Sequence, residues 1–158
     1  MVREQLLQRL EKSWSDLQVS CSNLSDSEMM KPGVSGAWSV RDILAHVTTW
    51  EQEALKHLPT ILEGGRPPRY AATHGGINAF NRITTEQKKN LTLADIRREF
   101  EATHRQLISF IESVPEREFR TETAFRHRLR LDTYSHYPKH AEAIRAWREK
   151  QRNGNEGS

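Results

Sequence analysis

Two histidines four residues apart, His136 and His140, stand near the start of a predicted helix, and His46 lies on an earlier predicted helix. Residues at positions i and i+4 project from one helical face, so both imidazole rings can reach a single ion. A third imidazole from a facing helix would complete a set of three nitrogen ligands and leave positions open for water or substrate. A zinc ion in such a site lowers the pKa of its bound water to about 7. The spacing therefore predicts a metalloenzyme without naming its substrate.

Imidazole nitrogens favour Zn²⁺, Ni²⁺, Cu²⁺ or Fe²⁺. The alternative interpretation is three unrelated polar residues on helix edges. Asp132 lies just before the histidine pair, where it either accepts a hydrogen bond from a ligand imidazole or caps the last helix. The other histidines lack paired spacing and are predicted to lie on the surface: His57, His74, His104 and His127.

Four amphipathic segments must position the three histidines. Apolar side chains recur at helical spacing in residues 3–19, 39–59, 92–114 and from Asp132 or Ser135 to residue 151. Ser39 and Thr92 each precede an aspartate by three residues, the pattern of a capping box at a helix start. No strand pattern competes with these helices. The segments predict an all-α, up-down four-helix bundle with the metal in a cleft between the second and last helices.

Two connections are unusual in this bundle. Residues 63–76 are rich in Gly and Pro and too long for a tight turn, so they predict a crossover between the second and third helices, with a short helix over residues 77–90. Residues 116–131 are predicted to be irregular and to contribute to the rim of the cleft. Their arginines either receive an anionic thiol or phosphate or form a solvated basic loop: Arg126, Arg128 and Arg130.

Length and composition limit the class of protein. The 158 residues are expected to form one domain over residues 1–151, followed by a disordered polar tail over residues 152–158. The chain has no apolar run of the ~20 residues that a membrane span needs, and no apolar signal-peptide core near its start. A single cysteine fits a reducing cytoplasm, and a net charge of +3 from 24 basic and 21 acidic residues does not favour nucleic-acid binding. A small-molecule partner is expected, with monomer and homodimer both open.

Two motifs in this order resemble the DinB-like superfamily of bacterial four-helix bundles. The first is Trp38-Ser39-x-x-Asp42-x-x-x-His46-x-x-x-Trp50, and the second is His136-Tyr137-Pro138-x-His140 followed by Ile144 and Trp147. The resemblance implies metal ligands at His46, His136 and His140, with Zn²⁺ or Ni²⁺ as the ion. It also implies activities such as thiol-dependent S-transfer with bacillithiol or mycothiol, and maleylpyruvate isomerisation. The Trp-rich opening and the Gly75-Gly76-Ile77-Asn78 stretch resemble the colibactin self-resistance branch, in which the metal ligands are not always kept.

Several further residues are candidates for the site. Trp50, Tyr137 and Trp147 either line a substrate pocket or pack in the core, and Asn78 lies in the crossover that could roof the pocket. Glu51 and Glu53 are candidates for a general base, although solvated surface charge is the commoner role. The sequence favours a metal-dependent hydrolase or thiol S-transferase acting on a small molecule. The alternatives are a metal-free self-protection protein that binds or hydrolyses a reactive metabolite, and a structural bundle without catalysis.

Overall fold

Helices make up nearly all the regular structure of the chain. The computed structural model describes residues 2–156, in which no strand forms and one isolated bridge joins Ser35 and Trp38. The elements in chain order are α1 (Val2–Ser20), α2 (Asp26–Met29), α3 (Val40–Leu62), α4 (Tyr70–Thr73), α5 (Ile77–Gln87), α6 (Leu93–Ser113), the 3₁₀ helix η1 (Glu116–Phe119), α7 (Ala124–Asp132) and α8 (Tyr137–Glu156).

Both predicted capping boxes are confirmed. Ser39 Oγ accepts from the backbone N–H of Asp42 at 3.1 Å, and the Asp42 carboxylate accepts from the backbone N–H of Ser39 at 3.0 Å. Thr92 and Asp95 make the equivalent pair at the start of α6, at 3.1 and 3.2 Å. These bonds satisfy N–H groups that have no partner within the helix, so they fix where α3 and α6 begin.

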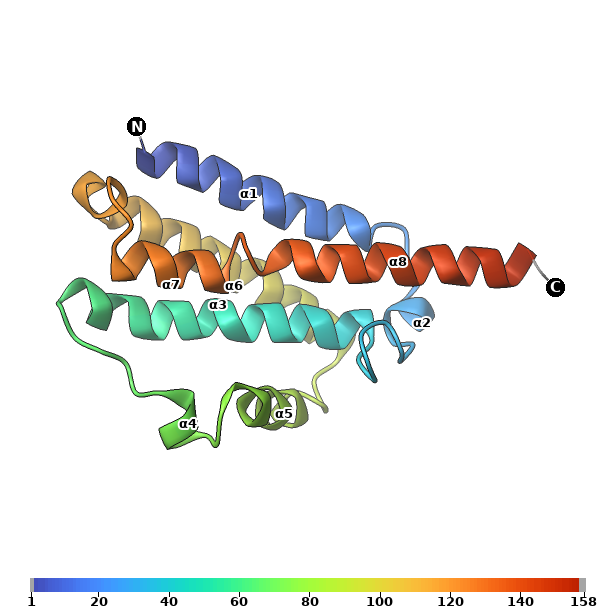
Figure 1. Cartoon of the computed structure of the whole chain (residues 1–158). Coiled ribbons are helices and arrows are strands. Elements are labelled where there is room, and N and C mark those ends of the chain that lie inside the picture. Colours follow the sequence, from blue (N-terminus) through green and yellow to red (C-terminus); the bar gives the residue numbers. More distant parts are fainter. Residues whose placement is uncertain (1, 157–158) are drawn as a thin grey trace.

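The four long units of the bundle are α1, α3, α6 and the end-to-end pair α7 and α8. Figure 1 shows α1 and α8 running in one direction and α3 and α6 in the other. Because α3 and α6 are parallel neighbours, the chain between them must return along the bundle, and α4 and α5 lie on this return path. The predicted all-α bundle with a crossover between its second and third long helices is confirmed.

Each long helix buries one apolar stripe in a shared core. The large apolar side chains with no exposed surface come from every unit of the bundle: Leu10, Leu17, Val40, Ile43, Val47, Leu58, Ile96, Leu107, Ile111, Phe119, Leu129, Tyr137 and Ile144. Complete burial of such a side chain contributes about 1.5–3 kcal/mol, so this core supplies the main stabilisation of the fold.

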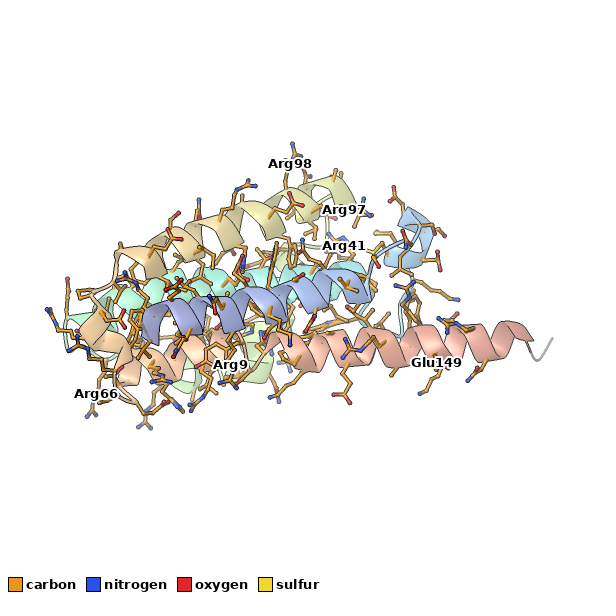
Figure 2. The ribbon with its side chains drawn as sticks, turned by 90° about the horizontal axis from the view of Figure 1, so that it is seen from above. Arg9, Arg41, Arg66, Arg97, Arg98 and Glu149 are labelled. Atoms are coloured by element: carbon orange, nitrogen blue, oxygen red, sulfur yellow. The ribbon has the colours of Figure 1, made fainter. Side chains whose placement is uncertain are left out.

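Charged side chains cover the outside of the bundle, as the outward-pointing Arg98 and Glu149 illustrate in Figure 2. Arg41 is an exception, because only 4% of it is exposed. Its guanidinium donates to the backbone carbonyls of Lys88 at 2.5 Å and Leu91 at 2.6 Å. This contact attaches the end of the crossover to the start of α3. Within the described part of the chain, no helix combines the length and apolar character that crossing a membrane requires.

A chain of polar groups crosses the core and takes one member from each long unit. Tyr137 on α8 donates its hydroxyl proton to Glu51 on α3 at 2.7 Å, and His104 on α6 faces the same carboxylate oxygen at 3.2 Å. The second ring nitrogen of His104 contacts the half-exposed carboxylate of Glu11 on α1. Trp14 stacks on the His104 ring with centroids 3.8 Å apart. The predicted surface position of His104 and the solvated role preferred for Glu51 are therefore wrong.

Three boundaries differ from those predicted. α3 continues past Pro59 to Leu62, because a proline in the last turn disrupts few remaining hydrogen bonds. Residues 124–132 form α7 rather than an irregular loop, since Thr123 caps the helix at 3.1 Å and Phe125 and Leu129 are buried. α8 extends to Glu156, so residues 152–156 are helical where a disordered tail is expected, and an ion pair between Arg152 and Glu149 lies in this extension. Residues 157–158 lie outside the described residues.

His104 is expected to make stability depend on pH. Burial opposes protonation of its ring, but the hydrogen bonds and negative charges of Glu51 and Glu11 outweigh burial and raise the pKa above 6.5. The resulting stabilisation is complete below the unfolded-state pKa and is lost as the pH rises through the higher folded-state pKa. Urea unfolding between about pH 6 and about pH 9 should show a fall in unfolding free energy that His104→Gln reduces. The exposed His127→Gln should behave as wild type, and equal pH dependence in all three proteins would contradict the assignment.

Candidate metal centre

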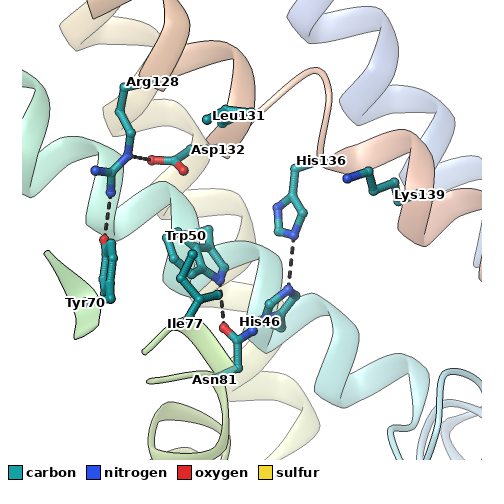
Figure 3. Close-up of a pocket in the computed structure, with 10 residues that line it drawn as sticks. All are labelled: His46, Trp50, Tyr70, Ile77, Asn81, Arg128, Leu131, Asp132, His136 and Lys139. Atoms are coloured by element: carbon teal, nitrogen blue, oxygen red, sulfur yellow. Dashed lines mark hydrogen bonds and ion pairs between the residues drawn. The ribbon is translucent and has the colours of Figure 1, made fainter. Parts of the chain in front are cut away.

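The three predicted histidines meet at one point. Nε2 of His136 lies 3.0 Å from Nε2 of His46 and 2.9 Å from Nε2 of His140. One ligand atom from each of the three residues lies within 4.8 Å of the other two. Figure 3 shows His46 and His136 approaching each other from α3 and from the segment before α8. The structure thus brings together residues that are 90 positions apart in the sequence.

A break between two helices positions His136. α7 ends at Asp132 and α8 begins at Tyr137, and the backbone N–H groups of His136 and Tyr137 both donate to the carbonyl of Thr133, at 2.8 and 2.9 Å. Pro138 falls in the first turn of α8, where its missing N–H removes no helical hydrogen bond. The side chain of His136 therefore projects from the end of the break, and the side chain of His140 projects from the first turn of α8.

Burial keeps the three imidazoles uncharged. It lowers the pKa of His46 from 6.5 to about 3, that of His136 to about 2 and that of His140 to about 4. The positive charge of Lys139 lowers the pKa of His136 and His140 further. Neutral imidazole is the form that binds a metal ion, so at neutral pH the rings are in the required state.

The donor set fits a divalent transition metal. Two nitrogens that bind one zinc ion at about 2.1 Å lie roughly 3.0–3.4 Å apart, and the two observed separations of 3.0 and 2.9 Å are close to this range. Nε2 of His136 faces two other Nε2 atoms, and a neutral ring has one N–H, so it can donate to only one of them. A cation among the three lone pairs would satisfy all of them at once.

The Nδ1 atoms of two of the histidines lack the hydrogen-bond partner that the second ring nitrogen of a metal-binding histidine usually has. In residues 2–156, the buried Nδ1 atoms of His46 and His136 have no hydrogen-bond partner on the protein. For Asp132 the sequence leaves open two roles, an acceptor for a ligand imidazole and a cap of the last helix. Its carboxylate accepts from Arg128, one helical turn earlier, at 2.6 Å. A contact between Asp132 and a ligand imidazole stays a prediction.

A cavity of about 410 Å³ opens beside the histidines. Its walls come from α3, the crossover, α7 and the start of α8 (Figure 3). The lining residues are His46, Trp50, Tyr70, Ile77, Asn81, Arg128, Leu131, Asp132, His136 and Lys139. Such a volume lies in the range of small-molecule sites.

Arg128 organises the end of the cavity away from the histidines. Its Nε donates to Asp132, and its Nη2 donates to the Tyr70 hydroxyl at 2.7 Å. Tyr70 in turn donates to Glu53 at 3.0 Å. Burial raises the pKa of Asp132 to about 6, and the positive charge of Arg128 limits the increase.

The predicted pocket residues divide into two groups. Trp50 lines the cavity, where its indole N–H donates to Asn81 at 3.0 Å. Tyr137 and Trp147 do not line it, because their side chains pack in the core. Asn78 is exposed and lines two neighbouring hollows instead, one turn of α5 away from the cavity residue Asn81.

The arginines of residues 116–131 differ in whether they reach the cavity. Arg128 and Leu131 reach the rim as predicted for this segment, whereas Arg126 donates to the Phe119 carbonyl and Arg130 pairs with Glu122. The prediction named neither Tyr70 nor Lys139, which also line the cavity. Lys139 had a signal, because it lies within the His136–His140 turn, but Tyr70 comes from a Pro-rich segment with no periodicity.

Removing the charge of Arg128 should raise the pKa of Asp132. The carboxylate is nearly buried, and Arg128 is the cation that stabilises its charged form. Carboxyl ¹³C NMR of the metal-free protein should give a pKa of about 6 in the wild type and a higher pKa in Arg128→Met. Arg130→Met, two residues along α7, is the matched control because its partner is Glu122. An unchanged pKa in Arg128→Met would show that burial alone sets the value.

Solved structures with the same fold include three informative neighbours. One is described as "Sibling Lethal Factor Precursor - DfsB", with a TM-score of 0.78, 16% identity, and coverage of 95% of this chain and 96% of that one. The colibactin self-resistance protein ClbS, crystallised in complex with a dsDNA, matches with a TM-score of 0.74 and 14% identity over 90% of this chain and 92% of its own. An uncharacterised protein from Escherichia coli UTI89 matches with a TM-score of 0.76 and 15% identity, over 95% of this chain and 94% of its own. At these identities the likeness establishes the fold alone.

Comparison with the curated proteins gave no match. The family model of the DinB superfamily, by contrast, matches residues 9–144, which include all three histidines and all or part of every long helix. The chain therefore belongs to the DinB superfamily.

Proposed function

We propose that His46, His136 and His140 bind one divalent metal ion, Zn²⁺ or Ni²⁺, and that the chain is a metal-dependent hydrolase or thiol S-transferase. The observation that carries this proposal is the convergence of three neutral imidazoles beside a cavity of about 410 Å³. A structural metal site is normally closed by four protein ligands, whereas a site with three ligands can accept water or substrate.

The ion would supply Lewis-acid chemistry, through polarisation of a carbonyl or activation of water or a thiol. The protein supplies the shape of the site and a group that can accept a proton. Asp132 lines the same cavity as His46 and His136, and its pKa of about 6 leaves it mostly ionised at pH 7. Arg128 holds one of its oxygens at 2.6 Å, so the carboxylate has a fixed orientation.

We favour a small molecule over a nucleic acid as the partner, since the cavity is small and its lining is partly apolar. A low-molecular-weight thiol is a candidate second substrate. ClbS was crystallised with dsDNA, and a mobility-shift assay with duplex DNA on this chain therefore belongs with the activity tests.

Metal content should depend on His46. Protein purified without an affinity tag is expected to contain about one Zn²⁺ or Ni²⁺ ion per chain by elemental analysis. His46→Ala should lose most of the metal and all activity in a hydrolase and thiol-transfer panel, because two imidazoles hold an ion far less tightly than three. Its helical content should stay unchanged, since the hydrophobic core surrounds α3 independently of the ion.

His127→Ala is the matched control, because this histidine is exposed on α7 and outside the cavity. Equal metal content in wild type and His46→Ala would overturn the proposal. A metal-free wild type with hydrolytic activity would instead indicate a self-protection protein, and a metal-free inactive one would indicate a structural bundle.

A further inference from the structure

The middle of the cavity presents exposed apolar side chains that the fold does not need. Ile77 on α5 is 55% exposed and Leu131 on α7 is 51% exposed, and both line the cavity. Figure 3 shows Ile77 beside Trp50 and Leu131 on the other side of Asp132, with Arg128 at one end of the group and His136 at the other. Large apolar side chains that gather at the mouth of a cavity are typical of a site that buries an apolar ligand.

The aromatic part of the wall is held in a fixed orientation. The Trp50 indole N–H is bonded to Asn81, and its ring lies 5.2 Å from the Tyr70 ring and 5.3 Å from the Phe80 ring. Because the hydrogen bond and the two ring contacts restrain Trp50, this part of the cavity wall is preformed. A ligand that contacts it would bind with little cost from ordering the side chain.

The charges of the cavity are unequal at its two ends. Arg128 is neutralised by Asp132, and its Nη2 is occupied by Tyr70. Lys139 is exposed and forms no ion pair within the described residues, and it lies on the rim next to His136 (Figure 3). The uncompensated positive charge is therefore at the histidine end, where a bound metal ion would add to it.

We propose that the cavity binds a compact apolar or aromatic molecule that carries one anionic group, with its apolar body between Trp50, Ile77 and Leu131 and its anionic group at Lys139. This assignment names the substrate class of the site and rests on the proposed function only in taking the cavity as the substrate site. The contribution of Lys139 does not require a metal, so it can be measured separately.

Isothermal titration calorimetry with a matched pair of probes tests the assignment. 2-Naphthoate and the neutral 2-naphthamide have nearly the same shape and differ in charge. The metal-free protein should bind naphthoate about fivefold more tightly than naphthamide, the strength of one partly exposed ion pair. Lys139→Gln should remove this preference and leave the affinity for naphthamide unchanged.

Leu131→Gln should weaken the binding of both probes by a similar factor, about fivefold or more for the loss of one apolar contact. Lys150→Gln and Val19→Gln are the matched controls, because both residues are exposed and lie outside the cavity. Equal affinity for the two probes, an unchanged preference in Lys139→Gln, or no binding of either probe would overturn the assignment.

The same titrations after addition of Zn²⁺ separate this inference from the proposed function. A protein that takes up no metal but retains the Lys139-dependent preference would refute the metalloenzyme and leave the ligand class standing. A protein that binds metal but shows no preference for naphthoate would leave the metalloenzyme standing and refute the ligand class.

Discussion

The carboxylate of Glu51 is the contact on which the arrangement of the bundle depends. It lies in the core, only 1% exposed, where it accepts from Tyr137 and faces His104. A buried charge that loses its partners costs several kcal/mol, so the helices that carry these partners cannot shift freely against α3. Tyr137 directly follows His136 in the chain. The bond that locks α8 to α3 therefore also fixes the separation of His136 from His46.

The helices were predictable because apolar spacing and the caps at Ser39 and Thr92 act within one or two turns. The convergence of His46 with His136 and His140 joins residues far apart in the sequence, and it was predicted from the resemblance of two motifs to the DinB-like superfamily. The polar chain through Glu51 and His104 could not be found in this way. Its members lie on different helices, and in the sequence a charged residue beside an apolar stripe looks the same whether it meets a partner or solvent.

The pocket residues were harder to predict for a geometric reason. Tyr137 begins α8 and faces the core, while its neighbour His136, in the break before the helix, lines the cavity. α7 was missed because its nine residues carry three arginines and a histidine and show little apolar periodicity. Burial of Phe125 and Leu129 stabilises it, and that burial depends on α3 lying alongside. Tertiary contacts of this kind have no signature in a local window of sequence.

The crossover differs from the other walls of the cavity because it contributes little to the packed core of the bundle. It contributes Tyr70, Ile77 and Asn81 to the lining, yet Phe80 is the single buried residue of α4 and α5. Most side chains of this segment can therefore be exchanged without disturbing the packing that holds the histidines. A bundle built this way can diverge in ligand preference by drift in one surface segment, while the geometry of its histidine cluster is inherited unchanged.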